Sequence, residues 1–284
     1  FDAFALYDFK PLSPTLHIFR TLQTLCFCKF TRAQQLTLYQ NKTYNMKTIQ
    51  LLLLTLTVMC LLSCSDSNSE NTETTTESTS TPDREYYQLK VYTFGTDAQI
   101  SLTDQYLADA YLPALKRQGI QPVGVFKRRR TETDTLRQTY VLIPFDELKT
   151  FASLEDRLVE DSTYLAAAST YLGASHDQPP YQRIESSLMR AFTDMPVLEP
   201  TPLDGPRAER VYELRSYESS NEQYYRSKVD MFNAGGEVKL FDRLGFNAVF
   251  YAEVLSGAHM PNLLYMTTFA DQASRDSLWP AFFE

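Results

Sequence analysis

Charged and aromatic side chains alternate along several segments of the sequence, and this alternation is the first sign of a binding site. Glu213, Arg215 and Tyr217 are spaced two residues apart, as are Lys90 and Tyr92. In a β-strand, residues two apart point to the same face of the sheet. If one face packs on helices and the other lines a barrel, such groups would form a polar pocket. We therefore predict a ligand site of eight barrel-lining residues: Lys90, Tyr92, Glu213, Arg215, Tyr217, Asn247, Tyr251 and Glu253.

Two other arrangements of these polar groups stay open. The groups can pair with one another in a satisfied hydrogen-bond network, or they can face solvent on an incomplete barrel. A buried cation needs a partner, which is either a carboxylate or a bound anion. If the groups do bind a ligand, we expect a small anionic or aromatic compound beside Arg215 and Lys90.

The sequence contains no pattern that assembles a catalytic or metal centre. His176 and His259 lie in predicted loops, where a surface histidine is a simpler interpretation than a haem or metal ligand. No HExxH, Walker or GxGxxG pattern occurs, and the glycine pair at 235–236 lacks the flanking residues of a phosphate loop. We assign no catalytic residue, no metal and no cofactor, and we leave open whether the protein is an enzyme.

A basic run at residues 127–130 stands out in an otherwise acidic protein. We interpret it as a solvated hairpin, with an anion or partner contact as the alternative.

An export signal precedes the folded part of the chain. Met46 and Lys47 are followed by an apolar run that ends at Leu61-Leu62-Ser63-Cys64, which resembles the lipobox of bacterial lipoproteins. The run is short for a bilayer-spanning helix, although an uncleaved anchor helix is the alternative. We predict that lipid on Cys64 attaches the protein to a membrane of the bacterial cell envelope, on the periplasmic face or the outer membrane surface.

The charge of the predicted mature protein excludes one class of partner. Residues 1–63 carry six Lys/Arg and two Asp, so the chain from Cys64 has 21 basic and 33 acidic residues and a net charge of −12. Such a protein is repelled by nucleic acid phosphates and by anionic lipids, so the lipid must supply the membrane attachment. Cys64 is the one cysteine after the cleavage point, which leaves no disulfide in the mature protein.

The body of the chain is a duplication. Residues 87–92 (YQLKVY) match 212–217 (YELRSY) at an offset of 125, residues 119–123 match 245–249 at an offset of 126, and residues 139–142 match 264–267 at an offset of 125. Each copy reads as a strand, a broken helix, two strands and a second helix, and the first copy adds a fourth strand at 181–192. Strands are expected at 86–94, 121–128, 137–144, 210–217, 246–255 and 262–269.

Pro113 and the glycine pair at 235–236 break the first helix of each copy, and Gly119 and Gly245 fit helix C-caps. The order β-α-β-β-α-β defines a ferredoxin-like unit, so the fold class is α+β with two tandem ferredoxin-like units forming an intrachain dimeric α/β barrel. The second unit ends inside its second helix and is therefore expected to be incomplete at its C-terminus.

The domain organisation follows from these signals. We interpret 1–45 as upstream translation outside the biological protein, 46–63 as the lipoprotein signal peptide and 64–84 as the acylated cysteine with a Ser/Thr/Glu-rich tether. Residues 85–195 form the first unit, 196–206 a Pro-rich linker and 207–284 the second unit.

The second unit resembles the NIPSNAP domain. The resemblance lies in the tyrosine-rich strand at 211–217, the glycine before residues 246–249, the segment 262–265, and Arg275 with Trp279 in the second helix. The whole layout is similar to tandem NIPSNAP-like lipoproteins of Bacteroidetes-type bacteria. This resemblance implies the dimeric α/β-barrel superfamily, which also contains monooxygenases and haem-degrading enzymes.

The family has no settled activity, so the resemblance implies a fold more than a function. We expect a non-catalytic barrel that binds a small ligand or a protein, with a cofactor-independent monooxygenase or isomerase as the alternative. Homo-oligomerisation stays open.

Overall fold

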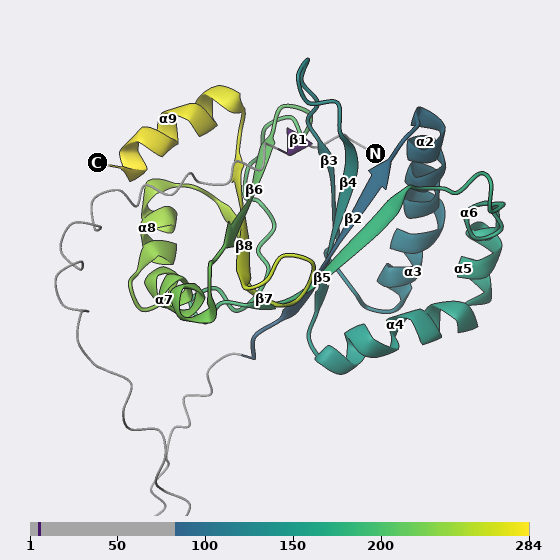
Figure 1. The fold of residues 1–284 in the computed structure, drawn as a ribbon, viewed down its shortest axis with the longest axis horizontal. Helices are drawn as coiled ribbons and strands as arrows, with labels where there is room; N and C mark the ends of the chain where they lie inside the picture. The colour runs from purple at the N-terminus through teal and green to yellow at the C-terminus, as the bar shows by residue number, and fades with distance from the viewer. Residues whose placement is uncertain (1–4, 7–82, 284) are drawn as a thin grey trace, which may run out of the picture. The chain divides into compact units, whose positions relative to one another are not determined.

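The computed structural model describes residues 5–6 and 83–283 (Figure 1). In these residues the strands form a closed barrel in the order β1-β3-β4-β2-β5-β7-β8-β6. All neighbouring strands pair antiparallel except the two-residue β1, Ala5–Leu6, which pairs parallel with β3 and β6. The predicted fold class is confirmed: two ferredoxin-like units in one chain share a dimeric α/β barrel.

The first unit contributes four strands in the order β5-β2-β4-β3. Their bounds are β2 Tyr86–Phe94, β3 Gly124–Arg128, β4 Arg137–Phe145 and β5 Arg183–Ala191. The helices of this unit lie together beside the strands in Figure 1. They are α2 Asp97–Tyr106, the π-helix η1 Leu107–Tyr111, α3 Leu112–Arg117, α4 Leu148–Glu160, α5 Ser162–Ala167 and α6 Ser169–Leu172.

The second unit contributes three strands in the order β6-β8-β7. They are β6 Val211–Glu218, β7 Ala248–Ser256 and β8 Asn262–Phe269. Its helices are α7 Glu222–Phe232, α8 Glu237–Leu244 and α9 Gln272–Phe282. The units join where β5 pairs with β7, and β1 lies between the other two edge strands, β3 and β6.

The two faces of the barrel have different neighbours. Inward side chains from β2 to β8 form one cluster with no helical member, which includes Leu89, Phe126, Leu214 and Met266. Outward side chains pack under the helices in two further clusters, one for each unit. The faces alternate along most of the strands, because successive side chains of a strand point to opposite sides, and the alternation breaks at the irregularity in β7, where Val249 and Phe250 both join the inward cluster.

The two predicted helix breaks differ in form. In the second unit, α7 ends before the glycine pair and α8 begins at Glu237, as predicted. In the first unit the helix continues through Pro113, which lies in the first turn of α3, and the irregularity is the π-turn just before it. Proline has no N–H to donate, and the adjacent π-turn, in which Leu112 N–H donates to Leu107 O, changes the hydrogen-bond spacing of the helix where that donor is missing.

The predicted glycine C-caps are confirmed. Gly119 and Gly245 both have left-handed backbones, with φ of 79° and 80°. Gly245 ends α8, and its N–H donates to the carbonyl oxygens of Asp242 and Phe241.

We expect Gly245→Ala to lower the free energy of unfolding by about 1–2 kcal/mol, the cost of a left-handed backbone for an L-residue. A Cβ at this position meets no atom within 4 Å, so the loss reports backbone strain alone. Gly205→Ala is the matched control, because Gly205 is equally open and its φ lies outside the left-handed region. Urea denaturation of the two variants measures the difference, and an equal effect at both sites would contradict the cap assignment.

The predicted linker at 196–206 packs along the barrel. Leu198 N–H donates to Glu85 Oε2 at 2.6 Å, Glu199 N–H donates to Val249 O at 3.0 Å, and Thr201 Oγ1 lies 2.7 Å from Thr268 Oγ1.

The predicted tether at 64–84 ends in the folded body. The Arg84 guanidinium donates to Glu253 Oε1 and to Ala191 O, both at 2.5 Å. The signal peptide, the acylated Cys64 and the tether up to residue 82 lie outside the described residues, as does most of 1–45. These assignments stay predictions.

Candidate functional site

The sequence-predicted residues of the first unit face the helices. Lys90 Nζ donates to Tyr111 Oη at 3.0 Å and to Glu155 Oε1 at 3.3 Å, and it lies 4.9 Å from the centre of the Tyr111 ring. Tyr111 belongs to η1 and Glu155 to α4. Tyr92 is buried in the helix-side cluster of the same unit. Both side chains therefore point away from the lumen of the barrel.

Glu213 is the centre of a buried ion-pair network in the second unit. Its Oε2 accepts from Arg275 Nε at 2.7 Å and from the Trp279 indole at 3.1 Å. Its Oε1 accepts from Arg215 Nε at 2.7 Å and from Arg275 Nη2 at 3.1 Å. The Arg215 guanidinium also stacks over the Trp279 ring, 3.7 Å from the ring centre. All four side chains meet between β6 and α9.

The electrostatics of this network favour an ionised carboxylate. Burial by itself would raise the pKa of Glu213, but the hydrogen bond from Arg275 and the charges of Arg215 and Arg275 outweigh it. The net pKa of Glu213 is lowered below 4.5. Because the carboxylate and both guanidinium groups are satisfied by one another, the network has a structural role and needs no bound anion.

The other predicted residues also occupy the outer face. Glu253 accepts from Arg84, from Arg190 at 3.4 Å and from Tyr225 at 3.4 Å. Tyr217 and Tyr251 pack in the helix-side cluster of the second unit.

Asn247 lies directly before β7, with φ of 46°. Its side-chain amide donates to Gly245 O at 3.0 Å and to Thr268 O at 3.3 Å, so it fixes a turn.

The prediction that these residues line the barrel is therefore wrong. The face was assigned on the premise that polar side chains line the lumen and apolar ones meet the helices. In the structure both faces are largely apolar, and the charged groups are paired beneath the helices. A shift of one residue exchanges the two faces of a strand. Leu89 and Val91, not Lys90 and Tyr92, face the lumen on β2, and Leu214 and Ser216 do so on β6.

A pocket of 390 Å³ lies in the lumen at the end where β3, β4, β5, β6 and β8 present polar residues. Leu89, Val91 and Leu264 form its apolar floor. Its polar lining comes from five strands and from the β7–β8 hairpin: Arg128, Gln138, Tyr140, Glu185, Ser187, Ser216, Glu218, Asn262 and His259. An apolar cavity with a few convergent polar groups is the usual form of a small-molecule site.

Several of these polar groups are already paired. Arg128 donates to Asp134 Oδ2 from Nε at 2.9 Å and from Nη2 at 2.6 Å. Tyr140 Oη donates to Gln138 Oε1 at 2.9 Å. Burial raises the pKa of Tyr140 and the Arg128 charge opposes that shift only in part, so the phenol stays protonated at neutral pH.

Two lining groups keep unused hydrogen-bonding capacity. Asn262 is 4% exposed; its amide nitrogen donates to Ser216 Oγ at 2.8 Å, but its Oδ1 is buried without a partner. Among the described residues, no hydrogen bond or ion pair is found for the Glu185 carboxylate, which lies partly buried in the wall. Buried polar atoms in native proteins are normally paired, so an unpaired one in a cavity wall points to a ligand or water.

Sequence reasoning missed this pocket, although a signal was present. Leu214, Ser216 and Glu218 form the alternating set opposite to the one chosen, and Asn262 opens β8, the strand that pairs with β6.

The two histidines agree with the loop interpretation. His176 is exposed, and the His259 side chain is 65% exposed, with Nδ1 3.5 Å from Glu218 Oε1.

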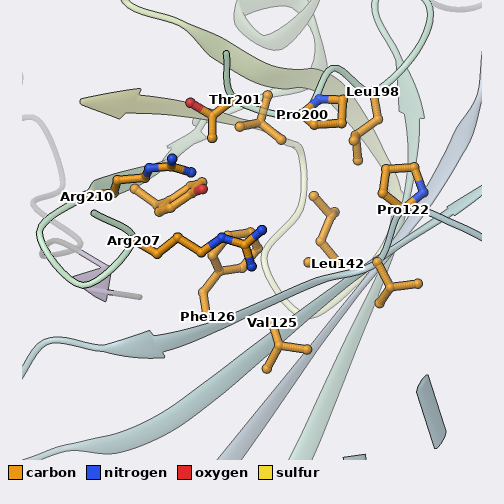
Figure 2. Close-up of a pocket in the computed structure, with 13 residues that line it drawn as sticks. Pro122, Val125, Phe126, Leu142, Leu198, Pro200, Thr201, Arg207 and Arg210 are labelled. Carbon is orange, nitrogen blue, oxygen red and sulfur yellow. The ribbon is translucent and has the colours of Figure 1, made fainter. Parts of the chain in front are cut away.

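A second cavity, of 280 Å³, lies at the opposite end of the barrel where β3 and β6 face each other (Figure 2). The Phe126 and Tyr212 rings meet across this edge with centroids 4.9 Å apart. Figure 2 shows Arg207 and Arg210 reaching over the cavity from the segment before β6. Arg210 is held by Leu203 O and Gly205 O, which fixes the segment rather than leaving the cation for a ligand.

The basic run at 127–130 is more structured than a solvated hairpin. Lys127 pairs with Asp104, Arg128 pairs with Asp134, and Arg129 donates to Gln272 of α9 at 3.2 Å. The hairpin therefore forms a contact between the two units.

In the described part of the chain, no group of three or more His, Cys, Asp or Glu side chains could hold a metal ion. None of the helices described has the length and apolarity needed to cross a membrane.

No protein-family model matches the sequence, and no curated protein matches it. Similar solved structures include a proposed monooxygenase from Fusobacterium nucleatum, with a TM-score of 0.45, 9% identity, and coverage of 71% of this chain and 83% of that one. A proposed monooxygenase from Lactobacillus acidophilus gives a TM-score of 0.44, 8% identity, and 71% and 82% coverage. A proposed chlorite dismutase gives 0.38, 13% identity, and 70% and 86% coverage. The strand order of the described residues defines the class of this protein as a dimeric α/β barrel.

Proposed function

We propose that the chain is a non-catalytic binding protein that holds a small organic ligand in the polar end of its barrel lumen. The observation that carries the proposal is the 390 Å³ pocket, with its apolar floor and its unpaired Asn262 Oδ1 and Glu185 carboxylate. An apolar floor supplies affinity through burial, whereas a few polar groups fix the orientation of a ligand.

The proposal also keeps the NIPSNAP-like assignment. Two residues that carry the resemblance, Arg275 and Trp279 of α9, have a physical role here because both donate to the buried Glu213. The pattern Arg-x-x-x-Trp therefore places two hydrogen-bond donors on one side of α9, where both reach the Glu213 carboxylate on β6. We further propose that lipid on Cys64 holds the barrel at a membrane of the cell envelope, with the acidic segment after it as a tether.

Filling the pocket tests the proposed function. Ser187 lies on β5 and lines the pocket, whereas Ser186 beside it is exposed on the other face of the strand. We expect the neutral fluorescent probe N-phenyl-1-naphthylamine to bind the full chain at one site. Ser187→Phe should weaken that binding by about tenfold or more, because the ring occupies the cavity. Ser186→Phe, the matched control, should leave it unchanged.

Three results would count against the proposal. They are no saturable binding to the full chain, equal binding by both variants, or a loss that is larger in Ser186→Phe. Thermal melting of each variant confirms that the comparison is made on folded protein. Oxygen uptake that depends on an added ligand would instead support the oxygenase alternative.

A further inference from the structure

The charged groups around the lumen pocket are not balanced. Its cation, Arg128, has Asp134 as an ion-pair partner, so that pair adds no net charge. Two carboxylates, Glu185 and Glu218, also line the pocket. Glu218 lies 3.5 Å from His259, a side chain that is 65% exposed, whereas Glu185 has no ion-pair partner among the described residues. The remaining charge of the pocket is therefore negative at neutral pH.

The unpaired polar atom in the buried wall of the pocket also favours a cationic or hydrogen-bond-donating ligand. Asn262 lines the pocket, is 4% exposed, and has its Oδ1 buried without a partner, while its amide nitrogen is held by Ser216. A carbonyl oxygen accepts hydrogen bonds and donates none. A ligand that satisfies both this oxygen and a carboxylate must be a donor.

We infer that the ligand of the lumen pocket is a small organic ammonium compound with a compact apolar body. The ammonium group would meet the Glu185 carboxylate and the Asn262 oxygen, and the apolar body would lie on Leu89, Val91 and Leu264. This inference rests on the proposed function and replaces the anionic ligand expected from the sequence, because the cations of that expectation, Lys90 and Arg215, are paired on the outer face.

Three probes with the same apolar body test the inference: 2-phenylethylamine, 2-phenylethanol and 3-phenylpropionate. Each displaces N-phenyl-1-naphthylamine from the full chain at pH 7. We expect the amine to bind about tenfold more tightly than the alcohol, because a single partly exposed ion pair with Glu185 contributes about that much. The carboxylate should bind most weakly, because Glu185 repels it. Glu185→Gln should remove most of the advantage of the amine and leave the affinity for the alcohol within about twofold.

The acidic protein attracts cations in general, so a control of equal charge is needed. Glu209→Gln removes one negative charge from an exposed position outside the pocket. It should leave the order and the spacing of the three affinities unchanged. If Glu185→Gln melts well below the wild type, Glu218→Gln replaces it, with a smaller expected loss because Glu218 is more exposed.

The outcomes separate this inference from the proposed function. Tighter binding of the carboxylate than of the amine, or an equal change in Glu185→Gln and Glu209→Gln, overturns the ammonium ligand while the pocket survives as a binding site. Failure of the naphthylamine probe itself to bind overturns the proposed function and the inference with it.

Discussion

Glu213→Gln should lower the free energy of unfolding by about 3 kcal/mol at pH 7, which is the scale of breaking a buried ion pair. The substitution preserves the shape of the side chain and removes its charge. Arg215 and Arg275 then lose their common carboxylate in a site where the Glu213 side chain is 4% exposed and the two arginines 19% and 23%. Chemical denaturation at pH 7 measures the loss.

The same network predicts a pH dependence with a definite sign. A folded-state pKa below the unfolded value means that the carboxylate stabilises the fold above pH about 4.5, and that this stabilisation is lost as the pH falls through the folded pKa. The wild type and Glu213→Gln should therefore differ fully at neutral pH and converge in acid, where the carboxyl group is protonated and resembles the amide. A difference that is constant from pH 7 to pH 3 would contradict the ionised network.

The equivalent pair in the first unit provides the control. Lys90 occupies the repeat position of Arg215, but its carboxylate partner Glu155 is 72% exposed on α4. Exposed ion pairs contribute little, so Glu155→Gln should cost below about 1 kcal/mol. A loss as large as that of Glu213→Gln would show that burial does not set the strength of the two pairs.

Cys64→Ala should move the protein from the membrane fraction to the soluble fraction almost completely. The predicted mature body carries a net charge of −12, so it is repelled by anionic lipids and has no electrostatic attachment to replace the lipid. Fractionation of expressing bacteria, together with labelling by radioactive palmitate, measures both attachment and acylation.

Cys60→Ala is the control for this experiment, because Cys60 lies in the apolar run of the predicted signal peptide. Its removal should leave labelling and fractionation unchanged. A Cys64→Ala protein that is still labelled, or still sediments with membranes, would refute the lipobox assignment.

Much of the fold could be predicted from the sequence because its signals are local. Strand β2 was predicted at 86–94 and β8 at 262–269, and both agree with the structure, since alternating residues and turn residues bound them. Gly119 and Gly245 could be assigned as helix caps because few other residues adopt a left-handed backbone at low cost. The repeat then specified that the same unit occurs twice.

The site could not be predicted, because the face of a strand depends on its partners. The sequence places Lys90 on one face of its strand and Glu213 with Arg215 on one face of theirs, but it does not show that Glu155 and Arg275, which come from helices, are near enough to pair with them. Once both faces are largely apolar, hydrophobic alternation no longer distinguishes the lumen from the helix side. The polar wall of the lumen is formed by residues such as Glu185 and Asn262, which are far apart in the sequence.

Native mass spectrometry of the full chain tests the central claim most directly, because it detects a ligand carried through purification. We predict a small organic adduct on the wild type that is released on collisional activation. We also predict the same adduct on Ser186→Phe and its loss from Ser187→Phe, whose ring fills the lumen pocket. A wild type without any adduct, or an adduct retained equally by Ser187→Phe, would contradict the lumen as the ligand site.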